Sequence, residues 1–175
     1  RIGDTRLSLA ALSPETRNAL DKRLPPFWSR GNPVDLLGTA GPDDFEAAVT
    51  ACLTDDQIDA VSIMLTPQAM SDATLVADAV IAAARDAVKP VLAVWLGQAS
   101  VASARARLSQ AGIPHFPSPE RAVAALAALE TCRLRVPRDT PPAARDAGAA
   151  PPDVPAAQRT IDGVLARGGG MMAPA

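Results

Sequence analysis

Two nearly continuous apolar runs, AVSIML at residues 60–65 and VLAVWL at residues 91–96, lie between longer segments with helical periodicity. Short runs that are apolar at every position are typical of strands buried on both faces. Parallel strands need crossover connections, and the flanking segments have the length of helices. We therefore expect an α/β fold with a mostly parallel sheet, in which these two runs are the central strands.

Two further runs, at residues 34–37 and 113–116, extend the expected sheet to about four strands. Amphipathic helices are predicted before, between and after the strands, because apolar residues recur at helical spacing and suitable caps precede them. The expected caps are Ser13 for a helix over 14–24 and Ser71 or Asp72 for a helix with Leu75, Val76, Ala79, Val80 and Ala83 inward. Pro42 is expected at a first helical position and Gly112 at a helix end.

The composition excludes several classes of partner. The 175 residues carry a net charge of -2 with both signs dispersed, so we expect no binding to nucleic acid or to anionic lipid. No apolar stretch approaches the roughly 20 residues that cross a bilayer, and the N-terminus is polar, so a cytoplasmic, soluble protein is expected. Cys52 and Cys132 lie at apolar positions of helical patterns and are expected to be free, buried thiols.

The character of the chain changes after residue 132. Seven of the 17 prolines fall within residues 133–175, among alanine, arginine and aspartate. This is a linker composition, within which residues 156–167 can form a short helix. The predicted organisation is one domain over residues 1–132 and a Pro/Ala/Gly-rich linker over 133–175.

In an open parallel sheet, ligands bind at the carboxyl ends of the strands, here the loops at 38–41, 66–71, 97–99 and 117–118. In the strand runs before these loops, Asp35 either caps backbone donors in a turn or points toward a ligand, and Trp95 either lines a pocket or packs in the core. The single histidine, His115, has no metal-ligating neighbours in sequence and is expected to be structural. No nucleophile elbow, P-loop or Cys-x-x-Cys pair is present, so no catalytic residue and no metal site are predicted.

Several blocks of sequence, in a fixed order, resemble one enzyme family. They are LSPET at 12–16, LPPFW at 24–28, NPVDL at 32–36, LTPQAM at 65–70, KPVLAVWLG at 89–97 and AGIP at 111–114. In these blocks the chain resembles the NDP-forming acyl-CoA synthetases, in particular the ADP-forming acetyl-CoA synthetases. It also resembles the related bacterial protein lysine acetyltransferases and, more distantly, succinyl-CoA synthetase.

The resemblance implies a flavodoxin-like, three-layer domain that follows CoA-binding and phosphohistidine domains and precedes an ATP-grasp portion. The parent would interconvert acyl-CoA, NDP and phosphate with carboxylate, CoA and NTP, through acyl phosphate and phosphohistidine. It would use CoA and ATP or ADP with magnesium, and it would be oligomeric. The resemblance implies that Pro67, Gln68, Ala69 and Met70 contact the acyl group. The full set of expected substrate-binding residues is Asn32, Asp35, Gly38, Thr66, Pro67, Gln68, Ala69, Met70, Trp95 and Gly97.

The chain also departs from the family pattern. It starts just after the position where the family domain has its first strand and glycine-rich turn, and it has no phosphohistidine motif. We therefore expect a fragment that contributes loops to an acyl and CoA site without catalysing the reaction alone. Two alternatives stay open: a regulatory acyl-CoA-sensing part of a protein lysine acetyltransferase, and a stand-alone flavodoxin-like binding module.

Overall fold

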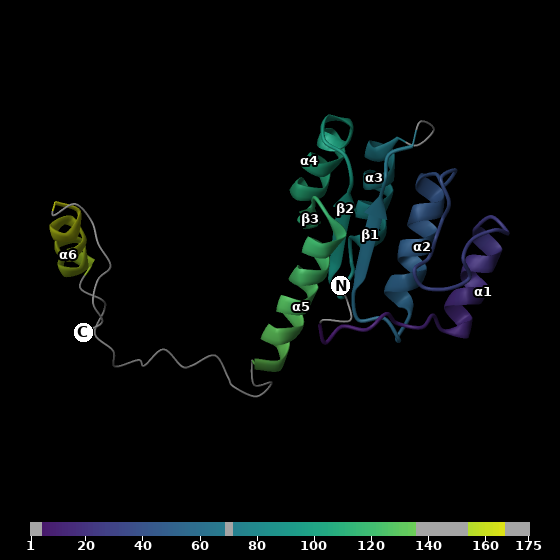
Figure 1. Ribbon diagram of the computed structural model, residues 1–175, viewed down its shortest axis with the longest axis horizontal. Coiled ribbons are helices and arrows are strands. Elements are labelled where there is room, and N and C mark those ends of the chain that lie inside the picture. The colour runs from purple at the N-terminus through teal and green to yellow at the C-terminus, as the bar shows by residue number, and fades with distance from the viewer. Residues whose placement is uncertain (1–4, 69–71, 136–153, 167–175) are drawn as a thin grey trace. The chain divides into compact units, whose positions relative to one another are not determined.

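The computed structural model describes residues 5–68, 72–135 and 154–166. It divides the chain into two compact units, Arg1–Arg135 and Val136–Ala175. The described part of the second unit is one helix, α6 (Val154–Ala166), where the sequence predicts a short helix (Figure 1). Within the described ranges, no helix has both the length and the apolar character needed to cross a membrane.

The first unit is built on a parallel sheet. Its strands are β1 (Val61–Leu65), β2 (Val91–Trp95) and β3 (His115–Phe116), in the order β1-β2-β3. Val61 pairs with Val91 at one end of the first ladder and Leu65 pairs with Trp95 at the other. The predicted α/β fold with a parallel sheet is confirmed.

The predicted strand at residues 34–37 is wrong, and the described sheet has three strands instead of about four. Side chains take up the backbone donors of this segment. The Asp35 N–H donates to Ser29 Oγ at 2.9 Å and the Leu37 N–H donates to Asp35 Oδ1 at 2.9 Å. Because these groups are already bonded locally, they do not form a ladder.

The described residues of the first unit form five helices, of which α1 packs on α2: α1 (Pro14–Arg23), α2 (Pro42–Thr54), α3 (Ala73–Ala84), α4 (Ala102–Gln110) and α5 (Pro119–Arg135). A short 3-10 turn, Ala99–Val101, leads into α4. Ser13 Oγ accepts from the Thr16 N–H at 3.1 Å, and Asp72 Oδ1 accepts from the Thr74 N–H at 2.8 Å. Gly112, with φ 77°, follows α4. These caps are as predicted.

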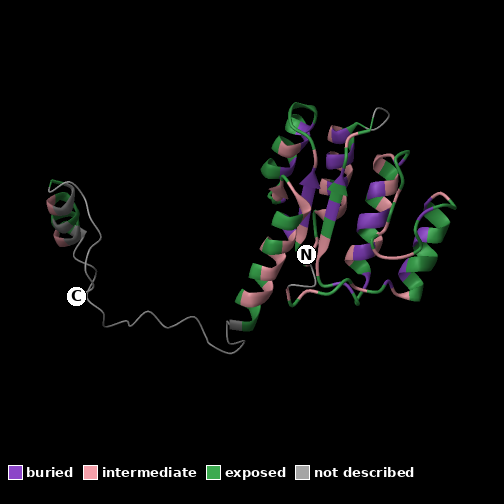
Figure 2. Cartoon of the chain, in the orientation of Figure 1, coloured by how far each residue is buried: buried purple, intermediate pink, exposed green. Residues whose placement is uncertain are grey.

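The two faces of the sheet are covered differently. Ile63, Leu65, Ala93 and Trp95 point to one face, where they form a core with residues of α2, α3 and α4. Leu92 and Val94 point to the other face, on which α5 packs against β2 and β3 (Figure 2). All three layers are therefore present at β2.

At β1 the expectation of a central strand buried on both faces is wrong. β1 is the outer strand of the described sheet, and Ser62 and Met64 are exposed. The reason is the position of α5, which packs mainly on β2 and β3. The apolar Met64 thus lies on a part of the sheet that the described helices leave uncovered.

Two side-chain orientations also differ from expectation. Leu75 is 54% exposed, whereas Val76, Ala77 and Val80 are fully buried, because α3 packs between α2 and α4 and turns this stripe inward. Cys132 is exposed near the end of α5, while Cys52 is buried on α2. Both thiols are free, as predicted.

Candidate functional site

The loops that follow β1 and β2 lie at the same end of the sheet. Beyond the last strand pair, the Leu96 N–H still donates to the Leu65 carbonyl at 2.8 Å. This bond keeps the two segments side by side as far as Thr66 and Gly97. The loops into α3 and α4 begin at these residues (upper end of the sheet in Figure 1). The predicted location of a ligand crevice is this end of the sheet.

Glycines at this end allow three loops to approach closely. Gly97 has φ 117°, and a Cβ atom built there would lie 3.0 Å from Ser100 Oγ and 3.5 Å from Pro67 Cγ. A Cβ atom on Gly38 would lie 3.8 Å from Cγ and Cδ of Gln68. The structure therefore brings Gly38, Pro67, Gln68 and Gly97 together. We call this group the loop cluster.

The other residues of the 66–71 loop are only partly described. Thr66 and Gln68 are exposed and Pro67 is half-buried. Ala69 and Met70, also expected to contact the acyl group, lie outside the described residues.

Asn32 and Asp35 hold the first of these loops through backbone contacts. Asn32 Nδ2 donates to the Ala10 carbonyl at 2.8 Å. Asp35 Oδ1 accepts from the N–H of Leu37, a residue with φ 65° directly before Gly38. Of the two interpretations left open for Asp35, the structure shows the turn-capping one. The αL conformation of a leucine is costly, and this bond helps to maintain it.

Trp95 packs in the core and does not lie on a pocket wall. Its side chain has no exposed surface, and its Nε1 donates to the Ala73 carbonyl at 3.2 Å. Because Ala73 is the first residue of α3, Trp95 fixes the start of that helix below the loop cluster. Any contribution of Trp95 to binding would be indirect.

Two residues at this end were missed by sequence reasoning, Ser100 and Arg105. Ser100 faces Gly97, and Arg105 of α4 donates from Nη2 to the Trp95 carbonyl. The polar segment ASARAR at 102–107 reads as a solvated helix face, so nothing in it marks Arg105. The contact of Ser100 could have been predicted from Gly97, because a glycine at such a turn permits close approach of a neighbouring side chain.

The charges near the loop cluster are uneven. The first turn of α2 carries Asp43 and Asp44, and the N-cap of α3 is Asp72. The segment from Gly97 to the first turn of α4 has no acidic residue. Helix N-termini favour anions. Of these three helix starts, the one after Gly97 has no carboxylate that would compete with an anionic ligand.

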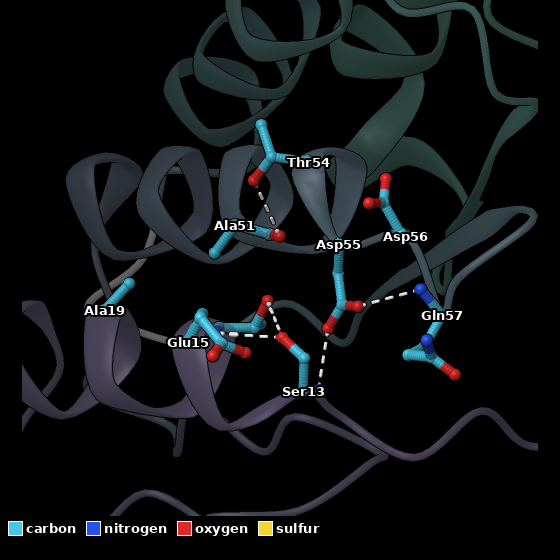
Figure 3. Close-up of a pocket in the computed structure, with 9 residues that line it drawn as sticks. Ser13, Glu15, Ala19, Ala51, Thr54, Asp55, Asp56 and Gln57 are labelled. Atoms are coloured by element: carbon cyan, nitrogen blue, oxygen red, sulfur yellow. Dashed lines mark hydrogen bonds between the residues drawn. The ribbon is translucent and has the colours of Figure 1, made fainter.

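A hollow of about 530 Å³ lies between α1 and α2 (Figure 3). It lies near the end of α2, where Asp55 is the C-cap of that helix, and no sequence pattern predicted it. Its lining residues are Ser13, Glu15, Thr16, Ala19, Ala51, Thr54, Asp55, Asp56 and Gln57. The small side chains of Ala19 and Ala51 leave space between the helices, and the other residues are polar or acidic.

Asp55 is the buried carboxylate of this hollow, with 3% of its surface exposed. Its carboxylate accepts from the Ser13 N–H and from the Gln57 N–H, both at 2.9 Å. Burial alone disfavours the charged form, but these donors, with Thr16 and the Ser13 hydroxyl, outweigh it and lower the pKa of Asp55. Its hydrogen-bonding capacity is used to join the start of α1 to the end of α2, so the residue is structural.

The buried thiol of Cys52 is not in its reactive form. Burial raises the pKa of the Cys52 thiol to about 11, the Asp55 charge adds to this and Lys89 opposes it, so the thiol stays protonated near neutral pH. His115 Nε2 lies 3.1 Å from Ser109 Oγ, and a structural role for this histidine stays a prediction. The described residues include no group of three His, Cys, Asp or Glu side chains placed to hold a metal ion.

The chain is similar in sequence to parts of known acid-thiol ligases. A family model described as the ligase-CoA domain matches residues 1–135. The alpha subunit of ADP-forming acetate–CoA ligase I of Pyrococcus furiosus is 33% identical over 108 residues, which are 61% of this chain and 23% of that protein. ADP-forming acetate–CoA ligase I of Archaeoglobus fulgidus is 33% identical over 121 residues, 69% of this chain and 17% of that protein. The chain thus spans about a fifth of the length of these two relatives.

Solved structures give the same result. An acetyl-coenzyme A synthetase 1 of Candidatus Korarchaeum cryptofilum, described as dinucleotide forming and solved in complex with phosphate and ADP, superposes with a TM-score of 0.68. It is 30% identical, and the match covers 76% of this chain and 29% of that one. The apo form of the same synthetase also gives a TM-score of 0.68.

Proposed function

Because the chain belongs to the ligase-CoA domain family, we propose that it is the part of an NDP-forming acyl-CoA synthetase whose loops complete the site for the acyl group and CoA. The parent would convert acyl-CoA, NDP and phosphate into carboxylate, CoA and NTP, reversibly, by way of acyl phosphate and phosphohistidine. The relatives named as ADP-forming acetate–CoA ligases support acetate as the acid and ADP as the nucleotide.

The observation that carries this proposal is the loop cluster. In the loop after β2, Gly97 lies close to Pro67, and in the loop before α2, Gly38 lies close to Gln68; both Pro67 and Gln68 belong to the loop after β1. Gln68 is exposed and lies next to Gly38, a position without a side chain, and an amide side chain can both donate and accept hydrogen bonds to a ligand group. Asn32 and Asp35 act in this proposal by fixing the loop before Gly38.

The chain would contribute binding and positioning, and the phosphohistidine, the nucleotide and its magnesium would be supplied by partner domains. CoA-binding, phosphohistidine and ATP-grasp domains, in the same protein or complex, are the proposed partners. The exposed Ser62 and Met64 face of β1 offers such a partner an uncovered part of the sheet. A chain so placed would not turn over substrate alone.

The proposal is tested by replacing Gln68 with alanine in the intact parent protein. Since Gln68 is exposed and close to Gly38, Gln68→Ala should leave folding unchanged and lower kcat/KM for acyl-CoA formation by about tenfold, the effect of losing one hydrogen bond to the substrate. Gln110→Ala is the matched control, because Gln110 is exposed at the far end of α4. Equal turnover in both variants would remove Gln68 from the site.

A further inference from the structure

Arg105 is a half-buried cation that no carboxylate neutralises within the described ranges. The ion pairs in those ranges are Arg30–Asp21, Arg107–Asp78 and Arg133–Glu130. The Nη2 of Arg105 bonds to a backbone carbonyl, and its Nε is buried without a hydrogen-bond partner. A guanidinium that is partly removed from water and has no counter-charge is unfavourable, so its surroundings favour an anion.

The guanidinium lies at the carboxyl end of β2. It bonds to the carbonyl of Trp95, the last residue of that strand and two positions before Gly97. The ladder between β2 and β3 ends with the pair Val94–Phe116, and Pro117, which has no N–H, follows. Arg105 therefore donates to the Trp95 carbonyl just beyond the end of β3, where no strand partner is available.

The charge around Arg105 differs from that around the other loops. Asp43 and Asp44 follow the loop that contains Gly38, and Asp72 follows the loop that contains Gln68. The loop that begins at Gly97 carries the hydroxyl of Ser100 and is followed by Arg105, with no acidic side chain between them. A phosphate group would thus be attracted to the third loop and repelled by the first two.

Resting on the proposed function, we infer that Arg105 binds the phosphate group of the ligand at the loop cluster, with Ser100 as the neighbouring hydroxyl donor. The acyl or pantetheine part then lies toward Gly38, Pro67 and Gln68. A planar guanidinium presents paired N–H donors that fit phosphate oxygens. The phosphate could belong to an acyl phosphate or to CoA, and the two sources share this chemistry.

The test is a titration of the full 175-residue chain with inorganic phosphate, followed by the NMR signal of the Arg105 Nε–H group. That signal is identified by its absence in Arg105→Gln. The wild type should show a saturable shift. Arg105→Gln should weaken phosphate binding, read from the backbone amides of Gly97 and Ser100, by at least about tenfold, since a charge-assisted bond is lost.

Arg107→Gln is the matched control, because it removes the same charge from the same helix but breaks only the exposed pair with Asp78. It should bind phosphate as the wild type does. Equal affinity in the two glutamine variants, or no saturable shift in the wild type, would overturn the inference. If Arg105→Gln does not fold, Arg105→Lys is compared with Arg107→Lys, and equal affinities overturn it in the same way.

Parallel titrations with acetyl phosphate and CoA distinguish the sources of the phosphate. If Arg105→Gln weakens the binding of acetyl phosphate alone, Arg105 binds the phosphate of an acyl phosphate. If it weakens the binding of CoA, Arg105 binds a phosphate of CoA. The Gln68→Ala assay in the parent is independent of these titrations. Loss of activity in Gln68→Ala with Arg105-independent phosphate binding would refute the inference and leave the proposed function intact. Unchanged activity in Gln68→Ala with Arg105-dependent phosphate binding would remove Gln68 from the proposed site and support the inference.

Discussion

At the scale of single residues, Asp55 is the polar group on which the packing of α1 depends. Its carboxylate accepts two backbone N–H bonds from segments far apart in sequence. Asp55→Ala should lower the free energy of unfolding by about 2–4 kcal/mol, because two buried donors lose a charged acceptor. Urea denaturation at pH 7 measures this, and Asp56→Asn, at the exposed neighbouring carboxylate, should change stability by less than about 0.5 kcal/mol.

The pH dependence gives a second readout of the same residue. The pKa of Asp55 is lower in the folded protein than its ordinary value of 3.8. Its contribution to stability is therefore fully present above that value and is lost as the pH falls through the folded-state pKa. Asp55→Asn should lack this acid-induced loss. A variant that loses stability below pH 4 as steeply as the wild type would contradict the assignment.

Local residue patterns were predictable where cause and effect lie close in sequence. The Ser13 cap, the Asp72 cap and the Gly112 helix end follow from neighbours within a few positions. The contacts of Asp55 with Ser13 and of Arg105 with Trp95 join segments that only the folded chain brings together. No pattern in one sequence marks such partners.

At the scale of elements, the orientation of α3 is set by its two neighbouring helices. Val76 has no exposed surface, whereas Leu75 is 54% exposed. Val76→Ala should therefore cost about 2 kcal/mol, through lost burial and the cavity left behind, and Leu75→Ala less than about 0.5 kcal/mol. Thermal or urea unfolding of the two variants provides the measurement. A larger loss for Leu75→Ala would mean that α3 is rotated, with the stripe predicted from the sequence facing inward.

The element predictions failed where burial depends on the partners that a segment finds. Both AVSIML and VLAVWL are apolar throughout, yet β2 is covered on both faces and β1 on one, because α5 packs mainly on β2 and β3. Residues 34–37 have the composition of a strand, but Ser29 and Asp35 satisfy their backbone groups first. Of the predicted site, Pro67, Gln68 and Gly97 meet because loops at the carboxyl ends of parallel strands must share one edge, and Gly38 joins them although no strand precedes it.

At the scale of the whole molecule, the first unit contains the described core. Both buried clusters consist of residues between Leu12 and Ile113, and α5 covers the Leu92 and Val94 face of the sheet. We propose, as the composition predicts, that the domain ends close to residue 132 and that the remainder is a linker with one helix. A core that is complete within the first unit should not depend on the second.

Truncation after Arg135 should therefore leave the midpoint of thermal unfolding within about 2 °C of that of the full chain, because a change below about 0.5 kcal/mol moves it by no more than this. Truncation after Ser118 removes α5 and exposes Leu92 and Val94, which are almost completely buried. That loss is about 3–6 kcal/mol, comparable with the whole stability of a small domain, so the shorter chain should not fold cooperatively. Thermal unfolding of the full chain and of the two truncated chains, followed by circular dichroism, provides the measurement. If the chain ending at Arg135 unfolds many degrees below the full chain, residues 136–175 stabilise the core and are not a linker.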